Sequence, residues 1–425
     1  LFPNFISLFI VMIFILSCEF KERTNPLDPN SINGARSLQV PSVYSTIQMA
    51  IDNAENGDTI IVDTDTLRGD GNRNISFNGK SVLLKSKYGA DSTVIDIETE
   101  GRAFIFNNEE DSLAIVDGFN IINGGGSDGA AIIVSNQSGV VFENCVIKDT
   151  DSDESSAILI TNNGTAIFRD CVIKNNRRYQ PNANQGVYGV AISVQNSTII
   201  LDRTKILGNH GESFSSGQSS EGIGIWVNFG TVYMMNSLIA GNYHVDNGTG
   251  TSTYSTSTSG TALHGSQASV VMINSTITDN TGWQAVNSHN GYPFVVYNSQ
   301  SGHQIVIFNS IISGNPIIYG NQDPSESGTP PTNVYIEDNG VSYVDISNSI
   351  IKQDANESFV GWYFDSDNFC YDFDPLFADT NYVLSEYSRA IGLGGTSIED
   401  SDGNDISAPS VDINGDPRPN PAVSN

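Results

Sequence analysis

The sequence predicts an all-β protein, a single-stranded right-handed parallel β-helix solenoid that carries a short capping helix at its N-terminal end. Three observations support this prediction. A short phrase of alternating apolar residues returns between Leu113 and Ile351, a polar residue stands at the centre of each copy, and a second polar position follows later in each copy. A unit this short cannot bury its own apolar face, so successive copies must stack into one continuous core.

The clearest copies of the phrase are VVFENCVIK at Val140–Lys148 and AIFRDCVIK at Ala166–Lys174. Their Val, Ile and Phe residues alternate with a period of two, which is typical of strands, and the runs are too short for helices. The central polar residues of the aligned copies are Asp117, Asn144, Asp170, Arg203, Asn236, Asn274, Asn309 and Asn348. The second polar position holds Asn123, Asn176, Asn209, Asn242, Asn280 and Asn315.

Asparagine suits both positions because it tolerates a left-handed backbone conformation and its amide can bond to the N–H and C=O groups of a turn. Side chains stacked about 4.8 Å apart can also form hydrogen-bonded ladders. Crossovers between parallel strands are nearly always right-handed. A β-sandwich or a propeller is the alternative, but turn dipeptides for tight hairpins are scarce between the runs, which favours the solenoid.

The segment Val40–Val62 predicts the start of the folded part. Ser45 or Thr46 can cap a short helix, which Gly57 would end. The apolar face of this helix would hold Ile47, Ala50 and Ile51. Such a helix would plug the open end of the solenoid, where strand edges lack partners.

Residues 1–18 predict an export signal. The apolar run from Phe5 to Leu16 has the length of a signal-peptide core and is too short to span a membrane. The I-L-S-C sequence that ends it resembles a bacterial lipoprotein signal, which implies lipidation of Cys18 and a location at the outer membrane or cell surface. An ordinary secretion signal is the alternative. Residues 19–39 are polar and aperiodic and contain two prolines, which predicts a flexible tether.

Residues 40–358 are therefore expected to form the solenoid with its N-terminal cap, and residues 359–425 a C-terminal cap. The D-P-L-F phrase at 374–377 and the G-D-P-R-P phrase at 415–419 resemble the C-terminal cap of bacterial surface β-helix proteins with interchangeable anchors. That pattern normally continues for several residues, so we expect the sequence to be truncated here.

The phrase N-S-x-I followed by x-x-N, at Asn236–Asn242, Asn274–Asn280 and Asn309–Asn315, resembles the hallmark of the pectin-lyase-like β-helix superfamily. Polysaccharide lyases of this superfamily remove a proton α to a uronate carboxylate with a Lys or Arg base, while Ca²⁺ or another cation neutralises the carboxylate. No lyase, esterase or galacturonase motif aligns with the chain. The basic residues that best match lyase chemistry are Lys174, Arg177, Arg203 and Lys205.

The chain is strongly acidic, with 48 Asp and Glu residues against 19 Lys and Arg and a formal net charge of −29. This balance argues against nucleic acid or an anionic membrane surface as a partner. Basic residues gather between Lys148 and Lys205, and the next one is Lys352. An anionic polysaccharide would therefore bind, if at all, at this early basic patch.

From Asn176 onward each copy gains an insertion after the second polar position, so the insertions should leave one edge of the solenoid and lie beside one another. Flat aromatic rings in them could stack on sugar faces. The candidates for substrate binding are Tyr243, Tyr254, Trp283 and Tyr292. Glu212, Glu221 and Asp246 could supply the two carboxylates of a hydrolase, although solvated loop acids are the commoner case.

Two further features leave alternatives open. Cys145 and Cys171 occupy equivalent positions one coil apart, which allows either a disulfide or a stack of free buried thiols, and we favour the free thiols. Near the C-terminal end, oxygen-bearing side chains alternate as in calcium loops, but without the glycine of an EF-hand. These candidate calcium ligands are Asp400, Asp402, Asn404, Asp412, Asn414 and Asp416.

These observations together predict an exported, lipid-anchored, monomeric β-helix protein that binds extracellular polysaccharide or other cell-surface material. The alternative is a polysaccharide lyase or glycoside hydrolase that acts outside the cell. The lack of a recognisable catalytic motif favours the binding protein, whereas the basic and aromatic clusters keep the enzyme open. Calcium is the one cofactor that the sequence suggests.

Overall fold

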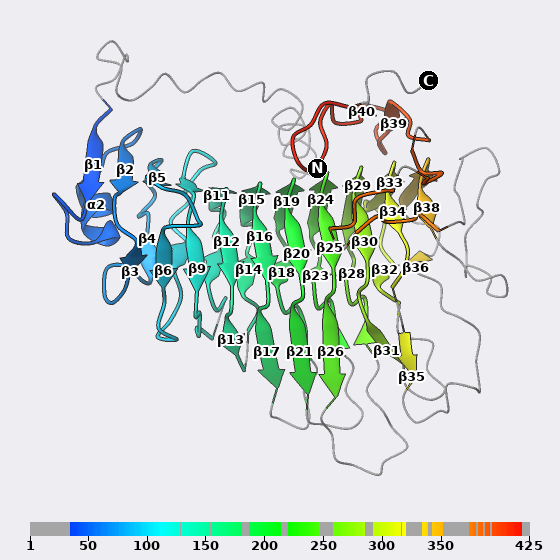
Figure 1. Ribbon diagram of the computed structural model, residues 1–425, viewed down its shortest axis with the longest axis horizontal. Coiled ribbons are helices and arrows are strands. Elements are labelled where there is room, and N and C mark those ends of the chain that lie inside the picture. The colour runs from blue at the N-terminus through cyan, green and yellow to red at the C-terminus, as the bar shows by residue number, and fades with distance from the viewer. Residues whose placement is uncertain are drawn as a thin grey trace.

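Three long parallel sheets run along the molecule, and each complete coil of the chain contributes one strand to each of them (Figure 1). The structure is a computed structural model that describes residues 35–127, 129–153, 155–180, 187–213, 220–246, 258–284, 292–315, 317–319, 334–338, 342–351, 374–379, 381–385, 387–391 and 393–418. The expected signal peptide, Cys18 and most of the expected tether lie outside these residues. Within them, no helix is long and apolar enough to cross a membrane.

Sheet A has 11 strands and sheet B has 10. In spatial order sheet A contains β1 (Ser37–Val40), β2 (Thr59–Val62), β5 (Leu83–Ser86), β8 (Ile115–Asp117), β11 (Gly139–Glu143), β15 (Thr165–Arg169), β19 (Thr198–Asp202), β24 (Thr231–Met235), β29 (Ser269–Ile273), β33 (Gln304–Phe308) and β37 (Tyr343–Ser347). Sheet B contains β3 (Thr66–Leu67), β6 (Val94–Asp96), β9 (Asn120–Ile122), β12 (Val146–Lys148), β16 (Val172–Lys174), β20 (Lys205–Leu207), β25 (Leu238–Ala240), β30 (Thr276–Thr278), β34 (Ile311–Ile312) and β38 (Ile350–Ile351).

Sheet C has nine strands, and smaller sheets lie beside the main three. Sheet C contains β4 (Ile75–Ser76), β7 (Phe104–Phe106), β10 (Ile132–Val134), β14 (Ile158–Thr161), β18 (Ile192–Gln195), β23 (Ile225–Asn228), β28 (Leu263–Ser266), β32 (Phe294–Asn298) and β36 (Val334–Asp338). Sheet D contains β13 (Asp151–Ser152), β17 (Arg177–Gln180), β21 (His210–Ser213) and β26 (Tyr243–Asp246). Two-stranded pairs are β22 (Ser220–Glu221) with β27 (Thr258–Ser259), β31 (Gly282–Gln284) with β35 (Ile317–Tyr319), and the antiparallel β39 (Ser397–Glu399) with β40 (Asp405–Ser407).

The predicted right-handed parallel β-helix is confirmed. All strand pairs of the three long sheets are parallel, and the chain visits sheets C, A and B in turn, as in β10, β11 and β12. Inward side chains of the three sheets form one core, and a run of phenylalanines stacks through its N-terminal half. Phe142 and Phe168 lie one coil apart with ring centroids 5.1 Å apart and nearly parallel planes.

The predicted capping helix is also present, as α2 (Ile47–Asn53). The Thr46 side chain accepts a hydrogen bond from the Met49 N–H and caps the helix N-terminus. The buried face holds the three predicted residues, Ile47, Ala50 and Ile51. The first strand, β1, begins at Ser37, inside the segment expected to be a tether, because Leu38 and Val40 alternate into the core and pair with β2.

The corner between sheets A and B is a column of residues in the left-handed conformation. Its members and their φ angles are Asn144 51°, Asp170 53°, Arg203 48°, Asn236 49°, Asn274 49°, Asn309 51° and Asn348 49°. The prediction that Asp117 is the first member of this column was wrong by one position. Asp117 pairs with Glu143, and Gly118 takes the corner, because glycine adopts positive φ without help from a side chain.

A second column, at the end of sheet B, is a buried amide ladder. Its members Asn176, Asn209, Asn242, Asn280 and Asn315 are buried. The Oδ1 of Asn242 accepts hydrogen bonds from both the backbone N–H and the Nδ2 of Asn209, at 3.0 and 2.9 Å. Thr150 occupies the ladder position before Asn176, so Asn123 was wrongly included in this column.

Cys145 and Cys171 begin a third column, which continues as Thr204, Ser237, Ser275, Ser310 and Ser349. Both cysteines are buried free thiols, and the Cys145 N–H lies 3.4 Å from the Cys171 sulfur. Burial raises the pKa of the Cys171 thiol. The Cys171 sulfur and the four serine hydroxyls each face the backbone N–H of the coil before them, which satisfies a buried donor at the turn.

Residues 395–408 lie along the outer face of sheet A, where Figure 1 labels β39 and β40. Ile398 of β39 and Ile406 of β40 pack against an apolar strip that includes Tyr233 and Val271. The Asn309 amide exchanges two hydrogen bonds with the backbone of Gly395, at 2.8 and 2.7 Å. This segment therefore covers apolar surface on the side of the solenoid.

We expect Asn242→Ala to lower the free energy of unfolding by about 3 kcal/mol, because it leaves several buried donors and acceptors of neighbouring coils without partners. Urea unfolding followed by circular dichroism measures this loss. Asn107→Ala, at an exposed turn, is the matched control and should change stability by less than about 1 kcal/mol. Equal effects of the two substitutions would show that the ladder does not hold the coils together.

Candidate functional site

The outer face of sheet C carries a row of aromatic and polar side chains. Because side chains alternate along a strand, Ile225 and Val227 of β23 are buried in the core while Trp226 between them points outward. Strand register places Trp226 beside His264 of the next coil, and Tyr335 lies two coils further along the same line. The stacking of coils thus gathers residues that are far apart in the sequence.

A turn before each sheet C strand folds a further residue over this face. Gly189, Gly222 and Gly260 have φ angles of 61°, 61° and 62° and stand four residues before the outward position of their strands. A Cβ atom on Gly222 would lie 2.6 Å from the Trp226 Cα, so only glycine permits this close reversal. The residues carried onto the face by these turns are Tyr188, Glu221 and Ser259.

Glu221 is the centre of a hydrogen-bonded cluster on the face. Its Oε2 accepts a hydrogen bond from the Trp226 indole N–H at 3.3 Å and lies 3.4 Å from the His264 Nε2. The other ring nitrogen of His264, Nδ1, lies 3.2 Å from the Ser259 hydroxyl. Glu221 and Trp226 are half-buried, whereas His264 and Ser259 are buried.

Burial lowers the pKa of His264, while the charge of Glu221 opposes that shift. The imidazole is therefore neutral near pH 7, with a single N–H. The two ring nitrogens face different partners, since Nε2 lies 3.4 Å from the Glu221 carboxylate and Nδ1 lies 3.2 Å from the Ser259 hydroxyl. The cluster thus presents a fixed carboxylate beside a neutral imidazole.

Tyrosine rings extend the cluster towards the C-terminal coils. The His264 and Tyr297 rings lie 5.6 Å apart, Tyr297 and Tyr335 lie 5.5 Å apart, and Tyr292 stacks on Tyr335 at 5.1 Å. Burial and a hydrogen bond to Glu337 raise the pKa of Tyr335 to about 12, so its phenol stays protonated. The result is a surface of flat rings with hydrogen-bonding groups beside them.

The four basic lyase candidates do not form one constellation. Lys174 and Lys205 face outward from sheet B, Arg203 lies in the corner between sheets A and B, and Arg177 lies on sheet D. Arg203 is paired with Asp170 at 2.8 Å and with Asp202 at 3.0 Å. These residues are close in sequence, but the coils place them on different faces of the solenoid.

Sheet D brings together two candidates of different kinds, Arg177 and Tyr243. The Arg177 guanidinium makes two hydrogen bonds to Glu212, at 2.9 and 2.8 Å, and one ion pair with Asp151 at 2.9 Å. His210, next to Arg177 in the sheet, stacks on Tyr243 with ring centroids 5.2 Å apart. Glu212 is thereby held on sheet D, away from the Trp226 and His264 that Glu221 contacts.

The other proposed sugar-binding residues divide between the two regions. Tyr292 belongs to the row on sheet C. Tyr254 lies outside the described residues, as do the side chains of Trp283 and Asp246.

The candidate calcium loops form tight turns in which Asp400 Oδ1 accepts the N–H groups of Asp402 and Asn404. Among the residues that the structure describes, no cluster of three or more His, Cys, Asp or Glu side chains could hold a metal ion.

Several residues of the row were not singled out from the sequence, namely Tyr188, Ser259, Tyr297 and Tyr335. The sequence contains a pattern that could have identified this face. In Y-G-V-A-I-S-V, E-G-I-G-I-W-V and S-G-T-A-L-H-G, a polar or aromatic residue interrupts an apolar strand four residues after a glycine. Aligning these three phrases would have placed Trp226 and His264 in one column.

Neither family models nor curated proteins yield a match to this chain. Among solved structures, the chain is similar to the PL6 family alginate lyase AlyGC, with 14% sequence identity and a TM-score of 0.23. The alignment covers 89% of this chain and 60% of the lyase chain, so the chain spans about three fifths of the length of that protein.

We expect the His264 imidazole to titrate below its ordinary pKa, and Glu221→Gln to lower that pKa further by removing the charge that favours protonation. Because folding disfavours the charged form, His264 costs stability as the pH falls below its ordinary pKa. Nuclear magnetic resonance of the ring carbons during a pH titration measures both values. An unchanged or raised pKa in Glu221→Gln would contradict the assigned contact.

Proposed function

We propose that the protein is an exported glycan-binding protein and that the row on the outer face of sheet C is its binding surface. The observation that carries this proposal is the line of Trp226, Tyr297 and Tyr335 around the Glu221 and His264 pair. Apolar rings stack on the C–H faces of sugars, and adjacent fixed polar groups bond to hydroxyls. Both kinds of group are present here within a few coils.

The charges near the row favour a neutral glycan over an anionic one. Glu221 and Glu337 bond to rings of the row, the Arg178 guanidinium bonds to the Tyr188 carbonyl beside it, and the whole chain carries a formal charge of −29. A polyuronate would be repelled by this field. Arg177 and Arg203, which could attract one, are already bonded to carboxylates.

The N-terminal sequence supports placing this activity outside the cell. Its apolar run before Cys18 has the features of an export signal, and lipidation of Cys18 would hold the protein at the outer membrane or cell surface as an anchored monomer. Secretion without an anchor is the alternative. In either case the protein would meet extracellular polysaccharide.

A panel of neutral glucans, xylans and mannans, with alginate and pectate beside them, tests this proposal by affinity electrophoresis and calorimetry. We expect binding to a neutral glycan, weakened about tenfold by Trp226→Ala because a stacking ring is lost. Tyr387→Ala removes a ring that is 79% exposed on the C-terminal segment and should leave affinity unchanged. Failure to bind any polysaccharide, or binding that survives loss of Trp226, would overturn the proposal.

A second candidate function is cleavage of the glycan, which the contact between Glu221 and His264 favours. A carboxylate beside a neutral imidazole can accept or relay a proton. Incubation with the same panel, followed by reducing-end assays and by absorbance of unsaturated products, separates the two functions. Turnover that Glu221→Gln abolishes would establish an enzyme, whereas binding without products supports a binding protein.

A further inference from the structure

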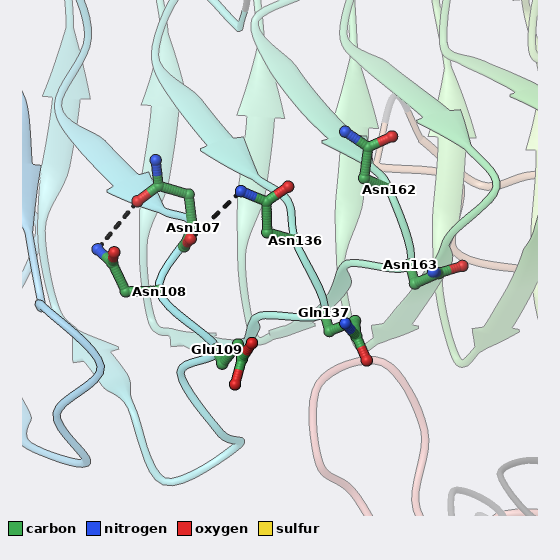
Figure 2. A pocket seen from close by; sticks show the side chains of 7 residues that line it. All are labelled: Asn107, Asn108, Glu109, Asn136, Gln137, Asn162 and Asn163. Carbon is green, nitrogen blue, oxygen red and sulfur yellow. Dashed lines mark hydrogen bonds between the residues drawn. The ribbon is translucent and has the colours of Figure 1, made fainter.

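A polar groove lies at the corner between sheets C and A, near the opposite end of the solenoid from Tyr335. It has a volume of about 610 Å³ and is lined by Asn107, Asn108, Glu109, Asn136, Gln137, Asn162 and Asn163. Figure 2 shows these side chains carried by the turns of three neighbouring coils. All of them are exposed, and apart from Glu109 each side chain is an amide.

The groove exists because the turns here are longer than the turns after β18, β23 and β28. Strand register pairs Thr161 with Gln195 and Thr165 with Thr198, so the turn after β14 has one residue more than the turn after β18. The turn after β7 is longer still and forms one wall. Glu110 fixes this wall from below, since its buried carboxylate accepts hydrogen bonds from the Gly79 N–H, the Asn108 N–H and the Ser138 hydroxyl.

The same corner continues from the groove towards the aromatic row. Its residues in the next coils are Asn196, Phe229 and Gln267, joined by backbone hydrogen bonds from coil to coil. Phe229 has a φ angle of 51° and is 47% exposed. A bulky side chain rarely adopts positive φ, so Phe229 places an exposed ring at a corner that the neighbouring coils fill with Asn196 and Gln267.

Phe229 stands three residues after Trp226, at the end of the same strand, so the corner and the row are neighbouring strips of one surface. From β23 to β36 the row spans three coil steps, roughly 14 Å, and from β7 to β36 the combined surface spans seven, roughly 34 Å. A short sugar chain can cover only the row, whereas a longer chain that follows the solenoid axis reaches the groove.

We propose that the amide groove, with Phe229, is a second glycan subsite that binds the same chain as the aromatic row. This inference rests on the proposed function and adds that the ligand is an extended neutral polysaccharide lying parallel to the solenoid axis. The amides donate to and accept from sugar hydroxyls, and Phe229 supplies a stacking face between the two subsites. None of these groups requires a charged ligand.

The test compares trioses and hexaoses of β-1,4-linked glucose, xylose and mannose by calorimetry. The double variant Asn136→Gly/Asn162→Gly removes two amides from positions with φ angles of 54° and 50°, which glycine adopts without strain. We expect the hexaose to bind about tenfold more weakly to this variant and the triose to bind unchanged. Phe229→Gly should show the same selectivity.

Asn175→Gly is the matched control, since Asn175 is exposed, has a φ angle of 55° and lies at the end of sheet B. It should leave both affinities unchanged. Equal weakening for triose and hexaose, or no weakening of the hexaose, would overturn the groove as a subsite while the aromatic row stands. If the unmodified protein binds neither length of any of the three sugars, the groove inference is overturned with the function on which it rests.

Discussion

The structure depends on the buried amide ladder at the end of sheet B. From Asn209 onward, each ladder asparagine accepts the backbone N–H and the amide N–H of the asparagine in the coil before it, which favours a single register between coils. A slip by one residue would bury unbonded donors and turn apolar side chains outward. Because the register is fixed, every outward position also becomes a straight column. The hydrogen-bonded register inside the solenoid therefore determines which side chains lie together on its surface.

Much of this architecture could be predicted from the sequence because repetition is visible there. The alternating apolar phrase, the corner asparagines and the capping helix all follow from local physical rules. The two assignment errors, at Asp117 and Asn123, arose where a residue other than asparagine can form the turn. Gly118 forms the first turn and Thr150 takes the ladder position. The binding row was harder to predict. Trp226, His264, Tyr297 and Tyr335 are separated by whole coils, and only strand register brings them together, whereas Lys174, Arg177 and Arg203 are close in sequence yet face different surfaces.

The outer faces of the three sheets carry different kinds of side chain, which explains why the row lies on sheet C. The outer face of sheet A is covered in its later coils by Ile398 and Ile406 of the C-terminal segment, and Arg177 and Arg203 are held in ion pairs with carboxylates. On sheet C the glycine turns bring Glu221 and Ser259 back over the strands, which adds a second layer of functional groups to a flat sheet. Half-buried rings then lie in a line with hydrogen-bonding groups beside them. This arrangement suits a polymer that lies along the axis.

A crystal structure of the protein with bound cellohexaose, or with the neutral hexasaccharide that binds most tightly, tests the central claim most directly. The account predicts sugar rings against Trp226 and Tyr335, with the chain running along the axis of the solenoid. Sugar bound instead on sheet B beside Lys174 and Lys205 would contradict it, because the register of the coils would then have assembled the binding surface on a different face.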